Sequence, residues 1–257
     1  MNFFEINSSS FDDFDSIARI LSRSQTAFHL PIVSENGWDF SCLDYTDEID
    51  RTIGLVNAYS KKLNVQHCIV HPPEPHISDE PLRSSNAFLF ENLSRLDVPV
   101  YMENIPSMKT EHFSILYNQA QKALNNQLLG LCFDAPHHFI SGTDPVKALQ
   151  NQVDKIGAIH ISDCYKDKDV HIPFDSGGVL PVEDFLRNVK KTRFSGYITL
   201  EMLPSSIDDI PAYIKSYLTT LKVLHYLKFL RSKTEMIIFW PLLKKYISRK
   251  SVDTMTS

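Results

Sequence analysis

The chain has 257 residues, of which 43% are hydrophobic, and carries a formal net charge of -5. This length suits one domain with a single large core, as in an α/β barrel. The acidic balance, with a pI near 6.0, gives no overall attraction to nucleic acid or to an anionic membrane surface. The sequence has no run of membrane-spanning length, and its N-terminus lacks the basic and apolar segments of a secretory signal.

The charge is unevenly distributed along the chain. Residues 222–257 contain eight Lys or Arg and two acidic residues, a net charge of +6, whereas residues 1–221 have a net charge of -11. The two parts could therefore meet different partners. The four cysteines show no CxxC spacing, and Cys68 and Cys132 lie within apolar runs. This usage favours a reducing, cytoplasmic setting.

Seven short apolar runs, rich in β-branched and aromatic residues, predict strands. In chain order they are NFFEI (2–6), QTAFHL (25–30), VQHCIVH (65–71), VPVYME (98–103), LLGLCFD (128–134), IGAIHIS (156–162) and GYITLE (196–201). Stretches of helical period lie between them, for example residues 47–63 and 112–124. This alternation predicts parallel strands joined by right-handed crossovers, which is the α/β class.

Six of these runs end in a side chain of a metal-binding type: His29, His71, Glu103, Asp134, His160 and Glu201. In a TIM (β/α) barrel all strands end at one mouth, where such enzymes place their chemistry. In a doubly wound sheet only the strands at the switch point could share a site. Neither GxGxxG nor a P-loop supports the second arrangement. We therefore predict a TIM barrel with seven clear strands.

The polar residues at these ends indicate a divalent metal site. His, Asp and Glu without Cys form the mixed nitrogen and oxygen shell that Zn²⁺, Mn²⁺ or Co²⁺ prefers, and the residue types leave the exact metal open. In DAPHH, His137 can reach back over the mouth from three residues beyond Asp134. We expect His138 to face solvent or to donate a hydrogen bond to a ligand. Asp169 and His171, in DVHIPF, have the spacing of another ligand pair.

The motifs FHLP, VHPP, YMEN, CFDAPHHF, IHISD, DVHIPFDSGG and TLEM together resemble the xylose isomerase-like TIM barrel superfamily. Within it they are most similar to endonuclease IV (AP endonuclease family 2) and to related sugar phosphate isomerases and epimerases, over roughly residues 1–205. In the endonuclease IV family nine side chains hold three zinc ions, so the resemblance favours zinc as the metal here, with Mn or Co as alternatives. The resemblance implies three ligand sets here: His29 and His71 with a bridging Glu103; Glu103, Asp134, His160 and Glu201; and His137, Asp169 and His171.

Two reactions fit this resemblance. The first is hydrolysis of a phosphoester by a multinuclear site, since divalent ions activate water and neutralise phosphate oxygens. The alternative is isomerisation or epimerisation of a sugar or sugar phosphate, with one metal and with Glu103 and Glu201 as the catalytic carboxylates that move a proton. A barrel that only binds its ligand, with a vestigial site, is a further alternative. Glu5 gives a mild hint of an epimerase, whose relatives often carry a Glu on the corresponding strand; a surface acid is the plain interpretation.

The expected partner is a small phosphoester or a sugar phosphate. DNA also fits the family resemblance, but the acidic main body has no basic stripe for it. Ile32 stands where the endonuclease family has an aromatic residue used in the DNA groove, and the chain starts at what resembles that family's second strand.

The C-terminal part has no clear counterpart in the resemblance. We expect residues 1–230 to form the catalytic barrel and residues 231–257 to be a basic, apolar extension packed on it. The run TEMIIFWP (234–241) could supply an eighth strand, but we favour an amphipathic helix on the barrel over this strand, and over a membrane-surface or partner-binding helix. An exposed edge beside the missing strand would favour a homodimer.

Overall fold

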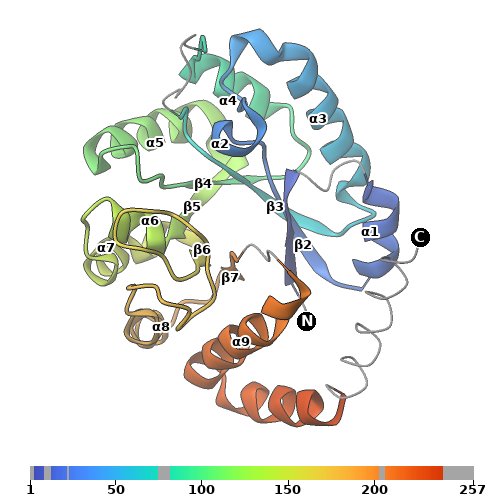
Figure 1. Ribbon diagram of the computed structural model, residues 1–257. Coiled ribbons are helices and arrows are strands. Elements are labelled where there is room, and N and C mark those ends of the chain that lie inside the picture. The colour runs from blue at the N-terminus through green and yellow to red at the C-terminus, as the bar shows by residue number, and fades with distance from the viewer. Residues whose placement is uncertain (1–2, 9–12, 22, 75–81, 203–205, 240–257) are drawn as a thin grey trace.

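The computed structural model describes residues 3–8, 13–21, 23–74, 82–202 and 206–239. Seven parallel strands form one sheet in chain order. They are β1 (Phe3–Ile6), β2 (Gln25–His29), β3 (Val65–Val70), β4 (Val100–Glu103), β5 (Leu128–Asp134), β6 (Ile156–Ile161) and β7 (Tyr197–Leu200). The strands curl into a nearly closed barrel with helices around the outside (Figure 1). The α/β barrel prediction is therefore confirmed.

The helices between the strands follow the predicted alternation, and α9 comes after the last strand. They are α1 (Phe14–Leu21), α2 (Val33–Asn36), α3 (Thr46–Ser60), α4 (Asn86–Ser94), α5 (Thr110–Leu124), α6 (Ala135–Ile140), α7 (Pro145–Gln152), α8 (Val182–Lys191) and α9 (Ile210–Leu224). Short 3₁₀ helices are η2 (Leu43–Tyr45), η3 (Asn125–Gln127), η4 (Val153–Lys155) and η5 (Ile207–Asp209). The two helical stretches expected at 47–63 and 112–124 correspond to α3 and α5.

The outer core lies between the strands and the helices. In α8 the buried residues Val182, Phe185, Leu186 and Val189 recur at helical spacing, so one face of the helix is apolar. Acidic residues in its first turn and lysines in its last turn suit the helix dipole. Phe185 lies 5.9 Å from Phe133 of β5, ring centre to ring centre. Such contacts attach each helix to the strand beside it.

A second, smaller core fills the barrel interior. Ile69, Tyr101, Cys132 and Ala158 form it, with Tyr197 packed against it. Side chains alternate between the two faces of a strand, so the residue two positions further along each strand also points inward. For Ile69, Tyr101 and Cys132 these next inward positions are His71, Glu103 and Asp134. The interior core thus places the polar strand ends directly above itself, at the mouth.

The barrel closes through side chains. β1 and β7 are the two ends of the sheet, and the backbone pairings in the described part of the chain do not join them. Across this seam the rings of Phe3 and Tyr197 lie 4.6 Å apart, and the Thr199 hydroxyl donates a hydrogen bond to Glu5 at 3.2 Å. The seam is therefore covered by ring packing and by this part-buried hydrogen bond.

The C-terminal segment does not complete the barrel. After α9, residues 226–239 form a further helix, which lies below α9 in Figure 1. The helix prediction is confirmed for residues 234–239, and the eighth-strand alternative is wrong there; residues 240–241 lie outside the described part. Among the described residues of this helix none belongs to the hydrophobic core, and Leu227 and Ile237 are 81% and 67% exposed. The packing of residues 231–257 on the barrel stays a prediction. The domain boundary at residue 230 stays a prediction.

Candidate metal centre

The mouth of the barrel brings all nine predicted ligand residues together. They fall into three groups of side chains whose nitrogen and oxygen atoms lie within 4.8 Å of one another: His29, His71 and Glu103; Glu103, Asp134, His160 and Glu201; and His137, Asp169 and His171. These groups have the same membership as the three sets implied by the family resemblance. The parallel register explains the convergence, since Asp134 pairs with His160 and Glu103 with Cys132 on adjacent strands.

Glu103 lies at the centre of the cluster and is completely buried. Its Oε2 is 3.4 Å from Nε2 of His29 and 3.6 Å from Nε2 of His71. The same oxygen lies 3.3 Å from Nδ1 of His160, and Oε1 lies 3.4 Å from Nδ1 of His137. Neither carboxylate oxygen has a hydrogen-bond partner among the described residues. Glu103 is therefore placed to bridge two groups of ligands.

In three of the histidines, Nδ1 lies within hydrogen-bond distance of an acceptor oxygen. Nδ1 of His29 lies 3.1 Å from the Leu30 carbonyl, and Nδ1 of His71 lies 2.6 Å from Oε1 of Glu74. Nδ1 of His137 lies 2.7 Å from the backbone carbonyl of residue 104. If these nitrogens carry the proton, each ring presents the lone pair of Nε2 to the mouth. Metal-binding histidines generally have this arrangement.

Several buried atoms in the mouth have no hydrogen-bond partner among the residues that the structure describes. They are Nε2 of His29, both oxygens of Glu103, Oδ2 of Asp134, Nδ1 of His160, Oδ1 of Asp169, Nδ1 of His171 and Oε2 of Glu201. Nδ1 of His160 and Oε2 of Glu201 are only 2.8 Å apart, yet their orientation gives no hydrogen bond. An unsatisfied buried polar atom costs about 1–3 kcal/mol. Divalent cations would satisfy many of these atoms at once, so the residues fit a metal centre.

The group formed by His137, Asp169 and His171 depends on a loop after β6. Nε2 of His137 is 2.7 Å from Oδ2 of Asp169, which is 3.3 Å from Nε2 of His171. The loop is held at its base by two backbone hydrogen bonds between Asp163 and Ile172. This short antiparallel bridge turns the chain back over the mouth. A predicted loop pair is thereby placed beside the strand-end residues.

The electrostatics of the mouth are dominated by burial and by pairing of opposite charges. Burial opposes a charge on His71, but Glu103 outweighs it and the pKa of His71 is raised to about 9. Burial likewise opposes a charge on Glu201, but His160 lowers the pKa of that carboxyl to about 2. For Asp134 burial wins, and its pKa is raised to about 7. Protons on the imidazoles are what a bound cation would displace.

Some residues around the mouth were not predicted. Glu74, which holds His71, follows it by three positions in HPPEP, so its spacing was a usable signal. Asn104 clamps the end of β5 through two hydrogen bonds to the backbone of Asp134, at 2.9 and 3.1 Å. The expectation for His138 was wrong: its ring is buried and stacked on Phe133 at 4.4 Å, and burial lowers its pKa to about 4.

The family comparison agrees with this geometry. A family profile described as "Xylose isomerase-like TIM barrel" matches residues 35–222. The chain belongs to this family. Its members include enzymes, among them an endonuclease and epimerases. A search of curated proteins gave no match.

Solved structures from this family share the fold at low sequence identity. An AP endonuclease of family 2 from Brucella melitensis is 13% identical, with a TM-score of 0.60, over 82% of this chain and 88% of that one. A D-allulose 3-epimerase from Methylomonas sp. is 16% identical, with a TM-score of 0.61, over 88% of this chain and 85% of that one. The IolI protein, solved with a zinc atom, is 17% identical, with a TM-score of 0.60, over 87% and 88%.

None of the described helices combines the length and the apolar character that a membrane-crossing helix needs.

Proposed function

We propose that this protein is a divalent-metal-dependent hydrolase of phosphoester bonds, with a multinuclear, zinc-type centre at the barrel mouth. The observation that carries the proposal is the group of His137, Asp169 and His171. It lies beside two other potential ligand groups that share Glu103. A single-metal enzyme would need only one such group. Three adjoining groups suit a reaction that spreads negative charge over several oxygens.

Each residue of the mouth would have its own role. Glu103 would belong to two ligand groups, one with His29 and His71 and the other with Asp134, His160 and Glu201. Divalent ions bound there would supply an activated water and neutralise charge on the phosphate oxygens. Glu74 and the carbonyl groups of residues 30 and 104 would keep the imidazoles oriented.

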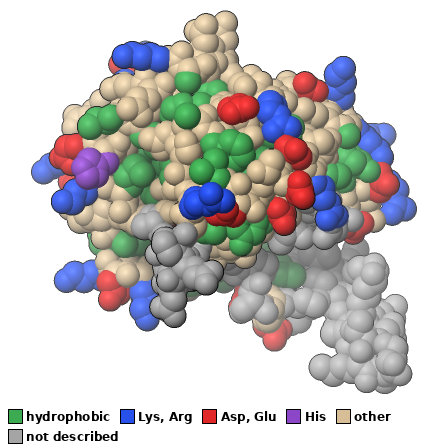
Figure 2. Space-filling view, turned by 90° about the horizontal axis from the view of Figure 1, so that it is seen from above, with side chains coloured by type: hydrophobic (Ala, Val, Ile, Leu, Met, Phe, Trp, Pro, Cys, Tyr) green, Lys and Arg blue, Asp and Glu red, His purple; other side chains and the backbone are tan. Residues whose placement is uncertain are grey.

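We propose a small phosphoester or sugar phosphate as the substrate, in preference to DNA. The first 221 residues carry a net charge of -11, which repels a polyanion over most of the barrel. On the face shown in Figure 2, the described Lys and Arg side chains are interspersed with Asp and Glu. A small substrate needs compensation of its charge only at the mouth, where bound cations would provide it.

A sugar or sugar-phosphate isomerase or epimerase is the second candidate. The observation that favours it is the four-residue group of Glu103, Asp134, His160 and Glu201, which could hold one ion without help from the loop. Its two glutamates come from well-separated strands, β4 and the end of β7. In this reaction Glu103 and Glu201 would take and return a proton on a carbon next to a carbonyl group.

Paired assays on metal-loaded protein distinguish the two reactions. We expect hydrolysis of bis(para-nitrophenyl) phosphate, or of a panel of sugar phosphates and abasic-site oligonucleotides. His137→Ala and His171→Ala should lower this rate about 100-fold or more, since each removes one ligand. The matched assay incubates ketoses and their phosphates in deuterium oxide. Carbon-bound deuterium uptake without phosphate release, unaffected by both substitutions, would overturn the hydrolase in favour of the epimerase.

A further inference from the structure

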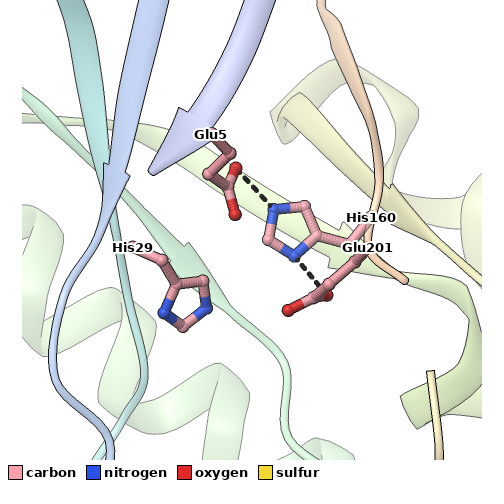
Figure 3. A group of neighbouring side chains, drawn as sticks. All are labelled: Glu5, His29, His160 and Glu201. Atoms are coloured by element: carbon pink, nitrogen blue, oxygen red, sulfur yellow. Dashed lines mark hydrogen bonds and ion pairs between the residues drawn. The ribbon is translucent and has the colours of Figure 1, made fainter. Parts of the chain in front are cut away.

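Glu5 is a buried carboxylate at the mouth that the ligand sets described above do not include. It lies on β1, and its side chain is only 8% exposed. Figure 3 shows its carboxylate pointing toward the ring of His160, on the opposite side of that ring from Glu201. A carboxylate in this position needs an explanation, because acidic side chains are seldom buried without a partner.

The His160 ring lies between carboxylates. Its Nε2 is 3.0 Å from Oε2 of Glu5 and makes a hydrogen bond there. Its Nδ1 lies 2.8 Å from Oε2 of Glu201 and 3.3 Å from Oε2 of Glu103, with hydrogen bonds to neither. A neutral imidazole carries one proton, on one nitrogen only. The aligned contact places that proton on Nε2, which leaves the lone pair of Nδ1 for the mouth.

Glu5 thus does for His160 what nearby groups do for three other histidines. The acceptors for His29, His71 and His137 lie within the connections that follow β2, β3 and β4. His160 instead receives its acceptor from β1, which is 155 positions earlier in the sequence. A shift of β1 relative to β7 would therefore move the acceptor of His160 and so disturb the metal centre.

Glu5 also contacts the other side of this seam. Its Oε2 accepts a hydrogen bond of 3.2 Å from the hydroxyl of Thr199 on β7. This oxygen therefore has two donors, one on β6 and one on β7. Although Glu5 has an oxygen within 4.8 Å of potential ligand atoms of His29, His160 and Glu201, its aligned oxygen is already used. The contacts favour an acceptor over an additional metal ligand.

We propose that Glu5 is a positioning residue of the metal centre, which holds the Nε2 proton of His160 and so turns Nδ1 toward Glu103 and Glu201. The inference rests on the metal centre of the proposed function, but it is independent of which reaction that centre performs. The same oxygen of Glu5 also contacts Thr199 on β7, so one carboxylate both holds His160 and links β1 to β7 across the seam.

The test compares zinc binding by full-length protein and three variants. Glu5→Leu removes the acceptor, Glu5→Gln keeps an acceptor oxygen, and Thr199→Val removes only the hydroxyl contact at the seam. We expect Glu5→Leu to weaken zinc binding about 10- to 100-fold without lowering the number of ions bound at saturation. Glu5→Gln should lose less, and Thr199→Val should stay within about threefold of the unchanged protein.

A second readout does not depend on the variants folding. Nitrogen-15 spectra of the His160 ring in the zinc-loaded, unchanged protein should show a protonated Nε2 and a zinc-bound Nδ1. The opposite tautomer would overturn the inference, as would unchanged zinc affinity in a folded Glu5→Leu variant. Loss of one ion at saturation in both Glu5 variants would make Glu5 a ligand instead. If the unchanged protein binds no zinc, the proposed function fails first.

Discussion

His67 lies on β3 and His71 directly follows the end of that strand, yet the surroundings of the two side chains are opposite. His67 lies among aromatic rings, 5.6 Å from Phe3 and 4.8 Å from Tyr101, centre to centre. Neither nitrogen of its ring has a hydrogen-bond partner in the described part of the chain. His71 lies beside Glu103 and Glu74. A packing histidine and a potential metal ligand are thus only four positions apart in the sequence.

The pKa values of the two rings express this difference. Burial lowers the pKa of His67 to about 3, and the charge of His160 acts in the same direction. Burial acts on His71 in the same direction, but Glu103 and Glu74 outweigh it and raise the pKa to about 9. The type of residue and its inward direction are therefore insufficient to identify a ligand. The height of the residue in the barrel decides its role.

The largest effect is expected at the barrel mouth, from loss of the Glu103 carboxylate. Glu103→Ala removes the carboxylate shared by two ligand groups. We expect zinc or manganese affinity to fall by more than about 100-fold, measured by titration calorimetry or with a chelator. Glu103→Gln, which keeps the shape, separates loss of charge from loss of packing. Equal affinity in all three proteins would show that the mouth does not bind metal through Glu103.

The second prediction concerns His67, the histidine buried among aromatic rings. Because the pKa of His67 is about 3 in the folded protein and near 6.5 in the unfolded chain, the unfolded state binds more protons between these values. His67 should therefore reduce the free energy of unfolding as the pH falls from about 6.5, by up to about 1.4 kcal/mol per pH unit. Urea unfolding of His67→Phe should show a shallower acid slope. Parallel slopes would contradict a buried neutral ring.

A third prediction concerns the smaller core inside the barrel, which contains Tyr101. Gly157 lies against Tyr101, and a Cβ atom at this position would come within 2.1 Å of the tyrosine ring. Gly157→Ala should destabilise the protein by about 1–3 kcal/mol, because a packed ring must move. Gly54→Ala is the matched control, since its Cβ would meet nothing within 4 Å. Equal thermal stability of the two variants would show that the interior layer is loosely packed.

The smallest effect is expected outside both regions. Leu227, in the helical segment 226–239, is 81% exposed and lies outside the hydrophobic core. Leu227→Ser should change the free energy of unfolding of dilute protein by less than about 0.5 kcal/mol. A loss of several kcal/mol in chemical unfolding would mean that this face is buried in solution.

The strands and the polar residues at their ends were accessible from sequence, because each is encoded locally by an apolar run followed by His, Asp or Glu. The groups that orient them were less accessible. The acceptor for His137 is a backbone carbonyl, which any residue at position 104 would supply. The acceptor for His160 comes from β1, and only the closed barrel brings the two together. From its residue type, His138 was expected to face solvent or to hydrogen-bond a ligand. Its ring instead stacks on Phe133, a contact that only the folded structure shows.

The C-terminal segment shows a different limit. Apolar residues at 234–239 fit a strand or a helix equally, because a short run carries no clear period. The structure settles this as a helix. The sequence does not say what the apolar face of this helix packs against, since amphipathic spacing does not identify the surface that will cover it.

The most direct test of the metal centre is elemental analysis of protein purified without chelator, beside His137→Ala and His171→Ala. We expect about three ions per chain, one for each ligand group, and the loss of about one ion in either variant. A single ion per chain, retained in both variants, would contradict the multinuclear centre.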